Sequence, residues 1–90
     1  MTHISYKPVK TYRGWAYRGV SIRRYHTNRV WFEFTIDMGF GQDVVMIYGK
    51  LIEARRSIDA RLEPRSGMFG SDMTNYEVHE GKIALKGLYT

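Results

Sequence analysis

The chain has 90 residues, no cysteine and a formal net charge of +5. A chain of this length buries only about 60% of its unfolded surface and supports one hydrophobic core, so we expect a single domain. The lack of cysteine excludes disulfides and thiolate metal sites and fits a reducing compartment. No long apolar run and no signal-peptide pattern occur, so we expect a soluble cytoplasmic protein without a membrane partner.

The basic residues are concentrated near the N-terminus. Residues 1–30 carry seven basic and no acidic side chains, whereas residues 31–90 carry seven basic and nine acidic ones. Residues 1–16 contain Pro8 and no sustained periodicity, which predicts a basic N-terminal arm. Such asymmetry favours an arm and first strand that approach a polyanion, because a cation set against a phosphate releases counterions. A solvated basic surface is the alternative interpretation.

Three strands are predicted in the first part of a core spanning residues 17–63. Apolar residues alternate with polar ones from Val20 to Tyr25 and again from Val30 to Met38, the period of a half-buried strand. The segment from Asp43 to Tyr48 is short, apolar and rich in β-branched residues, which is typical of a third strand. The intervening loops, which include His26 and Gly39–Gln42, suit hairpin turns.

A helix is predicted from Lys50 to Glu63, where the apolar period changes to that of one helical face. Within it, Arg55 and Asp59 have the spacing of an ion pair. The expected fold class is therefore α+β, a three-stranded antiparallel sheet packed on one amphipathic helix. The expected core consists of Val20, Ile22, Phe32, Phe34, Ile36, Val45, Ile47, Leu51, Ala54, Ile58 and Leu62.

Residues 64–90 are expected to form a loop followed by a C-terminal β-hairpin. Alternation resumes between Asn75 and Leu88, with a turn near Gly81. Because an isolated two-stranded ribbon is marginally stable in water, the hairpin should pack on the same domain or on a partner. Its role cannot be inferred from its residues.

Catalytic and metal-binding patterns are not found. The chain has no nucleophile motif, no phosphate-binding loop and no metal-ligand spacing among its histidines. Asp37 and Asp43 flank a loop and are better explained as turn-capping residues than as metal ligands. The triplet Tyr-Arg-Gly occurs at residues 12–14 and again at 17–19, and one of its glycines should mark a turn or bulge. We expect a non-enzymatic protein without cofactor or metal.

The segment from Tyr17 to about Leu62 resembles the plant ethylene-response-factor DNA-binding domain and the related arm-type domain of phage integrases. The resemblance is carried by Tyr17-Arg18-Gly19-Val20, by Arg23, by the aromatic strand from Trp31 to Asp37, and by residues 52–59. In that family three antiparallel strands lie in the major groove and a helix braces them. The resemblance implies DNA contacts from Arg18 and Arg23. The chain departs from the family at Ser21, Gln42, Val44 and Met46, where the family has arginine, arginine, tryptophan and glycine.

These observations favour a small protein that binds double-stranded DNA, as a regulatory or recombination accessory protein of a phage or mobile element. The expected DNA-binding residues are Arg18, Arg23, Arg24, Tyr25, Arg29, Lys7 and Lys10. Glu33 on the same face would repel phosphate. The alternative is a protein-binding inhibitor or adaptor, because Trp, Tyr and Arg are enriched at interface hot spots. Its expected contact residues are Trp31, Tyr25, Glu33 and Met46. Formation of a homodimer is left open.

Overall fold

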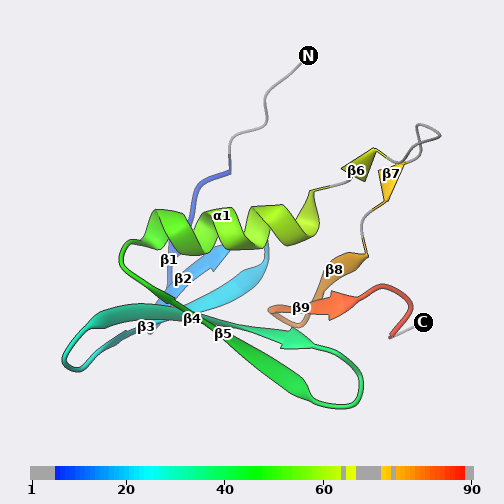
Figure 1. The fold of residues 1–90 in the computed structure, drawn as a ribbon. Helices are drawn as coiled ribbons and strands as arrows, with labels where there is room; N and C mark the ends of the chain where they lie inside the picture. The colour runs from blue at the N-terminus through cyan, green and yellow to red at the C-terminus, as the bar shows by residue number, and fades with distance from the viewer. Residues whose placement is uncertain (1–5, 64, 67–71, 74, 89–90) are drawn as a thin grey trace.

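The computed structural model describes residues 6–63, 65–66, 72–73 and 75–88. It is mostly β, with a single helix among these residues (Figure 1). The strands and the helix follow the order β1 (Val9–Lys10), β2 (Gly14–Tyr17), β3 (Val20–His26), β4 (Val30–Asp37), β5 (Gln42–Tyr48), α1 (Leu51–Leu62), β6 (Arg65–Ser66), β7 (Asp72–Met73), β8 (Tyr76–His79) and β9 (Lys82–Leu85).

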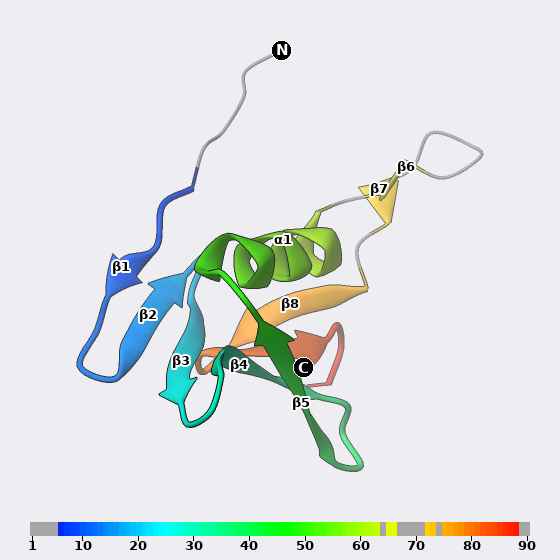
Figure 2. The ribbon, with the colours of Figure 1, turned by 60° about the vertical axis from the view of Figure 1, so that its left-hand side comes forward.

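The main sheet has seven strands and is mixed, which corrects the prediction of a three-stranded antiparallel sheet on a helix. The path is β1-β2-β3-β4-β9-β8, and β5 pairs with β4 off this path. Strand β4 is antiparallel to β3 and β5 but parallel to β9, through Ile36 opposite Ile83 and Asp37 opposite Ala84. The sheet curls beneath α1, so that the β8–β9 hairpin lies below the helix beside β4 (Figure 2). The three predicted strands are thus only the middle of a larger sheet.

The core lies between α1 and the inner face of the curled sheet. Seven of the expected core residues are buried, namely Val20, Ile22, Phe32, Phe34, Ile36, Ala54 and Ile58. The other four, Val45, Ile47, Leu51 and Leu62, are partly buried against this cluster. The sequence analysis missed Tyr17, Ile83 and Ala84, which are also buried. The C-terminal hairpin therefore completes the core.

Two hairpin turns share the same backbone conformation. The β2–β3 turn has positive φ at Arg18 (52°) and Gly19 (83°), and the β8–β9 turn has it at Glu80 (51°) and Gly81 (78°). Two central residues with positive φ are what a type I′ turn requires. The predicted turn near Gly81 is confirmed, and the turn expected at one of the two Tyr-Arg-Gly glycines lies at Gly19 of the second triplet. The two turns also lie close together, because the Ser21 N–H donates to the Gly81 carbonyl at 2.8 Å.

The N-terminal segment is part of the sheet, so the prediction of an arm outside it is wrong from Val9 to Ala16. Strand β1 pairs with β2, and β2 pairs along its whole length with β3. The first five residues of the predicted arm lie outside the described residues, as do Pro64, residues 67–71, Thr74 and the last two residues. Within the predicted 64–72 loop, β6 pairs with β7.

The predicted helix is confirmed with bounds Leu51–Leu62, one residue shorter at each end. The predicted Arg55–Asp59 ion pair is wrong. Arg55 instead donates to the backbone carbonyl of Tyr6 at 2.7 Å. Asp37 caps the β4–β5 turn as expected, since its Oδ1 accepts from the Gly39 N–H at 2.9 Å.

Replacing Ile83 with alanine should destabilise the whole domain, because this side chain is fully buried between β4 and α1. We expect a loss of about 2 to 5 kcal/mol in the free energy of unfolding, measured by urea denaturation. Lys86→Ala, at an exposed position after the same strand, is the control and should unfold like wild type. Equal stability of Ile83→Ala and wild type would contradict the placement of β9 in the core.

Candidate nucleic-acid interface

An aromatic row crosses the outer face of the sheet. Tyr25 on β3, Trp31 on β4 and Tyr48 on β5 are consecutive cross-strand partners. The Tyr25 and Trp31 rings are stacked, with centroids 5.3 Å apart and an interplanar angle of 9°, and Trp31 lies 6.1 Å from Tyr48. The Arg23 guanidinium lies 5.4 Å from the Tyr25 ring centre, and that of Arg29 lies 5.2 Å from the Tyr48 ring centre. Two cations therefore flank the row.

Glu33 lies on the same face and orients the central ring of the row. Its Oε1 accepts a hydrogen bond from Trp31 Nε1 at 3.3 Å. It also stands directly opposite Arg23 across the β3–β4 pair, yet no ion pair joins these two side chains in the described part of the chain. Arg23 therefore keeps its guanidinium donors available for a ligand.

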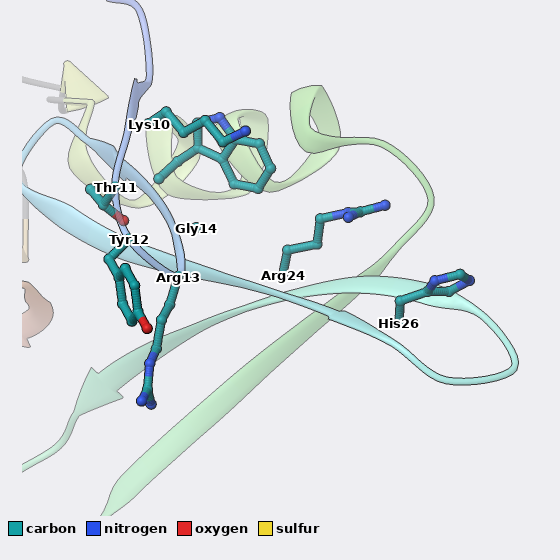
Figure 3. Close-up of a pocket in the computed structure, with 8 residues that line it drawn as sticks. Lys10, Thr11, Tyr12, Arg13, Gly14, Arg24 and His26 are labelled. Atoms are coloured by element: carbon teal, nitrogen blue, oxygen red, sulfur yellow. The ribbon is translucent and has the colours of Figure 1, made fainter.

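A basic hollow lies beside the end of β3, with a volume of about 230 Å³. Its basic side chains are Lys10, Arg13, Arg24 and His26, and no carboxylate takes part in the lining. Figure 3 shows Arg24 and His26 extending from β3 to one side, while Arg13 extends from the β1–β2 turn in the opposite direction. A lining with several basic side chains and no acid favours an anionic ligand.

The hollow forms because the β1–β2 turn is held close to β3. The turn is closed by the Thr11 N–H, which donates to the Gly14 carbonyl at 2.9 Å. A Cβ at Gly14 would collide with the backbone carbonyl of Ile22, so only glycine permits this approach. The first Tyr-Arg-Gly triplet therefore serves a hairpin turn, as the second does, and places Tyr12 and Arg13 at the rim.

Most of the predicted DNA-binding residues gather at one end of the sheet. Arg23 and Tyr25 alternate along β3 with Arg24 and His26, so the two pairs project to opposite sides. Arg29 follows in the β3–β4 loop, and Lys10 is on the neighbouring hairpin. The β3–β4 hairpin thus carries cations on both of its faces.

Arg18 lies apart from this group, at the opposite end of β3, and its side chain makes contacts within the protein. Its Nη1 donates to Asp59 at 2.9 Å and to Glu63 at 2.7 Å, and its side chain is only 13% exposed. Its guanidinium also lies 4.2 Å from the Tyr6 ring centre. Burial lowers the pKa of Arg18, but the hydrogen bonds to the two carboxylates outweigh burial and raise it. Two acids at the end of α1 therefore balance this charge.

Tyr17 belongs to the same cluster as Arg18. Its hydroxyl donates to both oxygens of Asp59, at 2.8 and 2.9 Å. Burial raises the pKa of the Tyr17 hydroxyl, and the hydrogen bond to Asp59 raises it further. The cluster ties the β2–β3 turn to the last turns of α1, which identifies it as part of the scaffold of the site.

Sequence reasoning missed several residues of the interface. Tyr48 could have been found, because it alternates in phase with Met46 on the third strand and so shares the face of Trp31. The duplicated triplet was a signal for Arg13, but it did not show that the turn lies next to Arg24. His26 was expected to be a loop residue, and it is instead the last residue of β3 and lines the hollow.

Replacing Arg18 with alanine should reduce stability by about 1 to 2 kcal/mol, because it removes charge-assisted hydrogen bonds whose acceptors are partly exposed. Thermal or urea denaturation measures the loss. Arg18→Lys is the matched control, which keeps the charge but not the planar guanidinium, and it should recover part of the stability. An unchanged unfolding midpoint for Arg18→Ala would contradict the structural role.

Comparison of the chain with protein-family models, curated proteins and solved structures finds no match. The function of the chain is therefore inferred from its own residues.

Proposed function

We propose that this chain is a non-enzymatic protein that binds double-stranded DNA through its β3–β4 hairpin and the adjacent basic hollow. The observation that carries the proposal is the hollow itself, which is lined by Lys10, Arg13 and Arg24 without a carboxylate. Such a site suits the phosphodiester backbone, the main source of protein–DNA affinity.

The β3–β4 hairpin is the element that would enter the DNA. Strands of a sheet can contact the DNA grooves, and this end of the sheet, where β5 also pairs with β4, has Arg23 on one face and Arg24 on the other. Each face therefore offers a cation to the phosphate backbone. Arg29 near the tip is placed for base edges, while Lys10, with Lys7 before it, follows the backbone. Arg18 is left out of the interface, since Asp59 and Glu63 balance its charge.

The geometry of the aromatic row favours duplex over single-stranded nucleic acid. Single-strand binding uses open ring faces on which unpaired bases stack. Tyr25 and Trp31 stack on each other, so each covers one face of its neighbour. The Arg23 guanidinium is also close to the Tyr25 ring. We infer that the row stiffens the hairpin and does not serve as a platform for bases.

A protein partner is the second candidate function, and exposed apolar side chains favour it. Met46 is 45% exposed and Tyr48 is 48% exposed, beside Trp31 on the outer face. Together with Tyr25 and Glu33 they form a mixed apolar and charged surface, as in an inhibitor or adaptor. This function predicts a partner surface with a basic group opposite Glu33.

The cellular setting is also a proposal. Among the described residues no helix has the length and apolarity needed to cross a lipid bilayer. We propose a cytoplasmic location, which a chain without cysteine fits, and a regulatory or recombination accessory role in a phage or mobile element.

The proposal predicts salt-sensitive binding to duplex DNA of random sequence, measured by electrophoretic mobility shift over a salt series. Lys10→Gln and Arg24→Gln should each reduce the slope of log affinity against log salt by about 0.9, because each removes one phosphate contact. Arg56→Gln, which removes an exposed cation on α1 away from the hollow, is the matched control and should leave the slope unchanged. Absence of duplex binding by wild type at low salt would contradict the proposal.

Replacing Glu33 with glutamine separates the two candidate functions. If the face meets phosphate, removal of the carboxylate charge should strengthen duplex binding several-fold at low salt, and this gain should shrink as salt screens it. If the face meets a basic protein surface, the same change weakens that complex and duplex binding stays negligible. Titration of both proteins with duplex DNA distinguishes the outcomes. The glutamine amide oxygen keeps an acceptor for Trp31 Nε1, and circular dichroism checks that the fold is intact.

A further inference from the structure

Strand β5 presents an open edge along its full length. Within the part of the chain that the structure describes, β4 is the strand that pairs with β5. All seven residues of β5 are at least partly exposed. Natural proteins protect such edges with lysine, proline, a bulge or a covering element. None of the residues from Gln42 to Tyr48 is lysine or proline, and the register with β4 runs without interruption.

Two hydrogen bonds, one at each end of the β4–β5 pair, show which β5 residues direct their backbone groups toward β4. The Met38 N–H donates to the Gly41 carbonyl, and the Gly49 N–H donates to the Val30 carbonyl. Hydrogen-bonded and non-hydrogen-bonded residue pairs alternate along an antiparallel ladder. Val45 and the residues two positions before and after it therefore direct their backbone N–H and C=O groups toward β4. The remaining residues of the strand direct theirs toward the open edge, and these are Gln42, Val44, Met46 and Tyr48.

We infer that β5 pairs with β5 of a second copy of this chain, in antiparallel register about a two-fold axis at Val45. This register places Val44 opposite the partner's Met46 and Gln42 opposite the partner's Tyr48. Both are pairs of outward-directed residues, so their N–H and C=O groups form a regular ladder. The alternation therefore fits a two-fold contact, which is self-complementary by symmetry.

The side chains of β5 favour a second copy as the occupant. Val44 is 54% exposed and Met46 is 45% exposed. In this register Val44 of one copy covers Met46 of the other copy on the outer face, and the reverse contact follows by symmetry. The strand carries a single charge, at Asp43, and it faces the partner's Ile47, so no like charges meet across the axis. On the inner face the two copies of Val45, each partly buried now, meet and exclude water. The pairing is independent of DNA binding.

A single engineered cysteine tests the register, because the chain has none of its own. Two Val45 residues at a non-bonded antiparallel pair have Cα atoms about 4.5 Å apart, within the disulfide range. Val45→Cys should form a covalent dimer under mild oxidation at least ten-fold faster than Phe40→Cys. Phe40 is 91% exposed at the β4–β5 turn, so it reports random collision. Equal cross-linking rates for the two variants would overturn the register.

Light scattering on wild type over a concentration series tests the dimer itself. The mass should rise from that of one chain to that of two, and Val44→Pro should abolish the rise because proline removes an outward-directed N–H while sparing the bonds to β4. Val44→Thr is the matched control and should still dimerise. A wild-type mass of one chain throughout, or a dimer retained in folded Val44→Pro, would overturn the inference. If Val44→Pro fails to fold, the cysteine comparison decides.

Discussion

The fold depends on how the edges of β4 are shared. One edge pairs with β5 along the whole strand, while the other pairs first with β3 and then with β9. Two strands can pair with the same edge of β4 only if the first strand leaves that edge before the second one meets it. Strand β3 leaves the edge at its start, where the tight turn at Arg18 and Gly19 connects it to β2. The space beyond Glu33 is filled by a parallel strand, and the resulting curl wraps the sheet around α1. Both the buried core and the outer face of the sheet result from the way β3, β5 and β9 share the edges of β4.

The arginines of the chain separate into two groups by environment. Arg18 and Arg55 hold the N-terminal part of the sheet against α1, through carboxylates in one case and a backbone carbonyl in the other. Acids at the C-terminal end of a helix oppose its dipole, and Arg18 offsets this cost at Asp59 and Glu63. Arg23 and Arg24 at the far end of β3 have no such partner among the described residues. Within the described part of the chain, positive charge is thus neutralised at Arg18 and left unpaired at Arg23 and Arg24 in the candidate interface.

The sequence predicted those features that depend on local periodicity. The alternation from Val20 to Tyr25 and from Val30 to Met38, the apolar run from Asp43 to Tyr48 and the change of period near Lys50 placed three strands and the helix correctly. The pairing of β4 with β9 could not be predicted, because parallel strands 47 residues apart (Ile36 and Ile83) have no local turn to mark them. The role of Arg18 was missed for the same reason, since its partners lie 41 and 45 residues along the chain. The hollow needs the close approach of Gly14 to β3, which no spacing in the sequence indicates.

The β4–β9 pairing also governs how the domain can form during synthesis on the ribosome. Hairpins such as β3–β4 close from neighbouring residues and can assemble early, whereas a contact between distant residues has a large loop-closure entropy. The edge of β4 at Ile36 and Asp37 therefore remains unpaired until Ile83 and Ala84 have left the exit tunnel. During that interval the nascent chain exposes an apolar surface of the kind that chaperones bind.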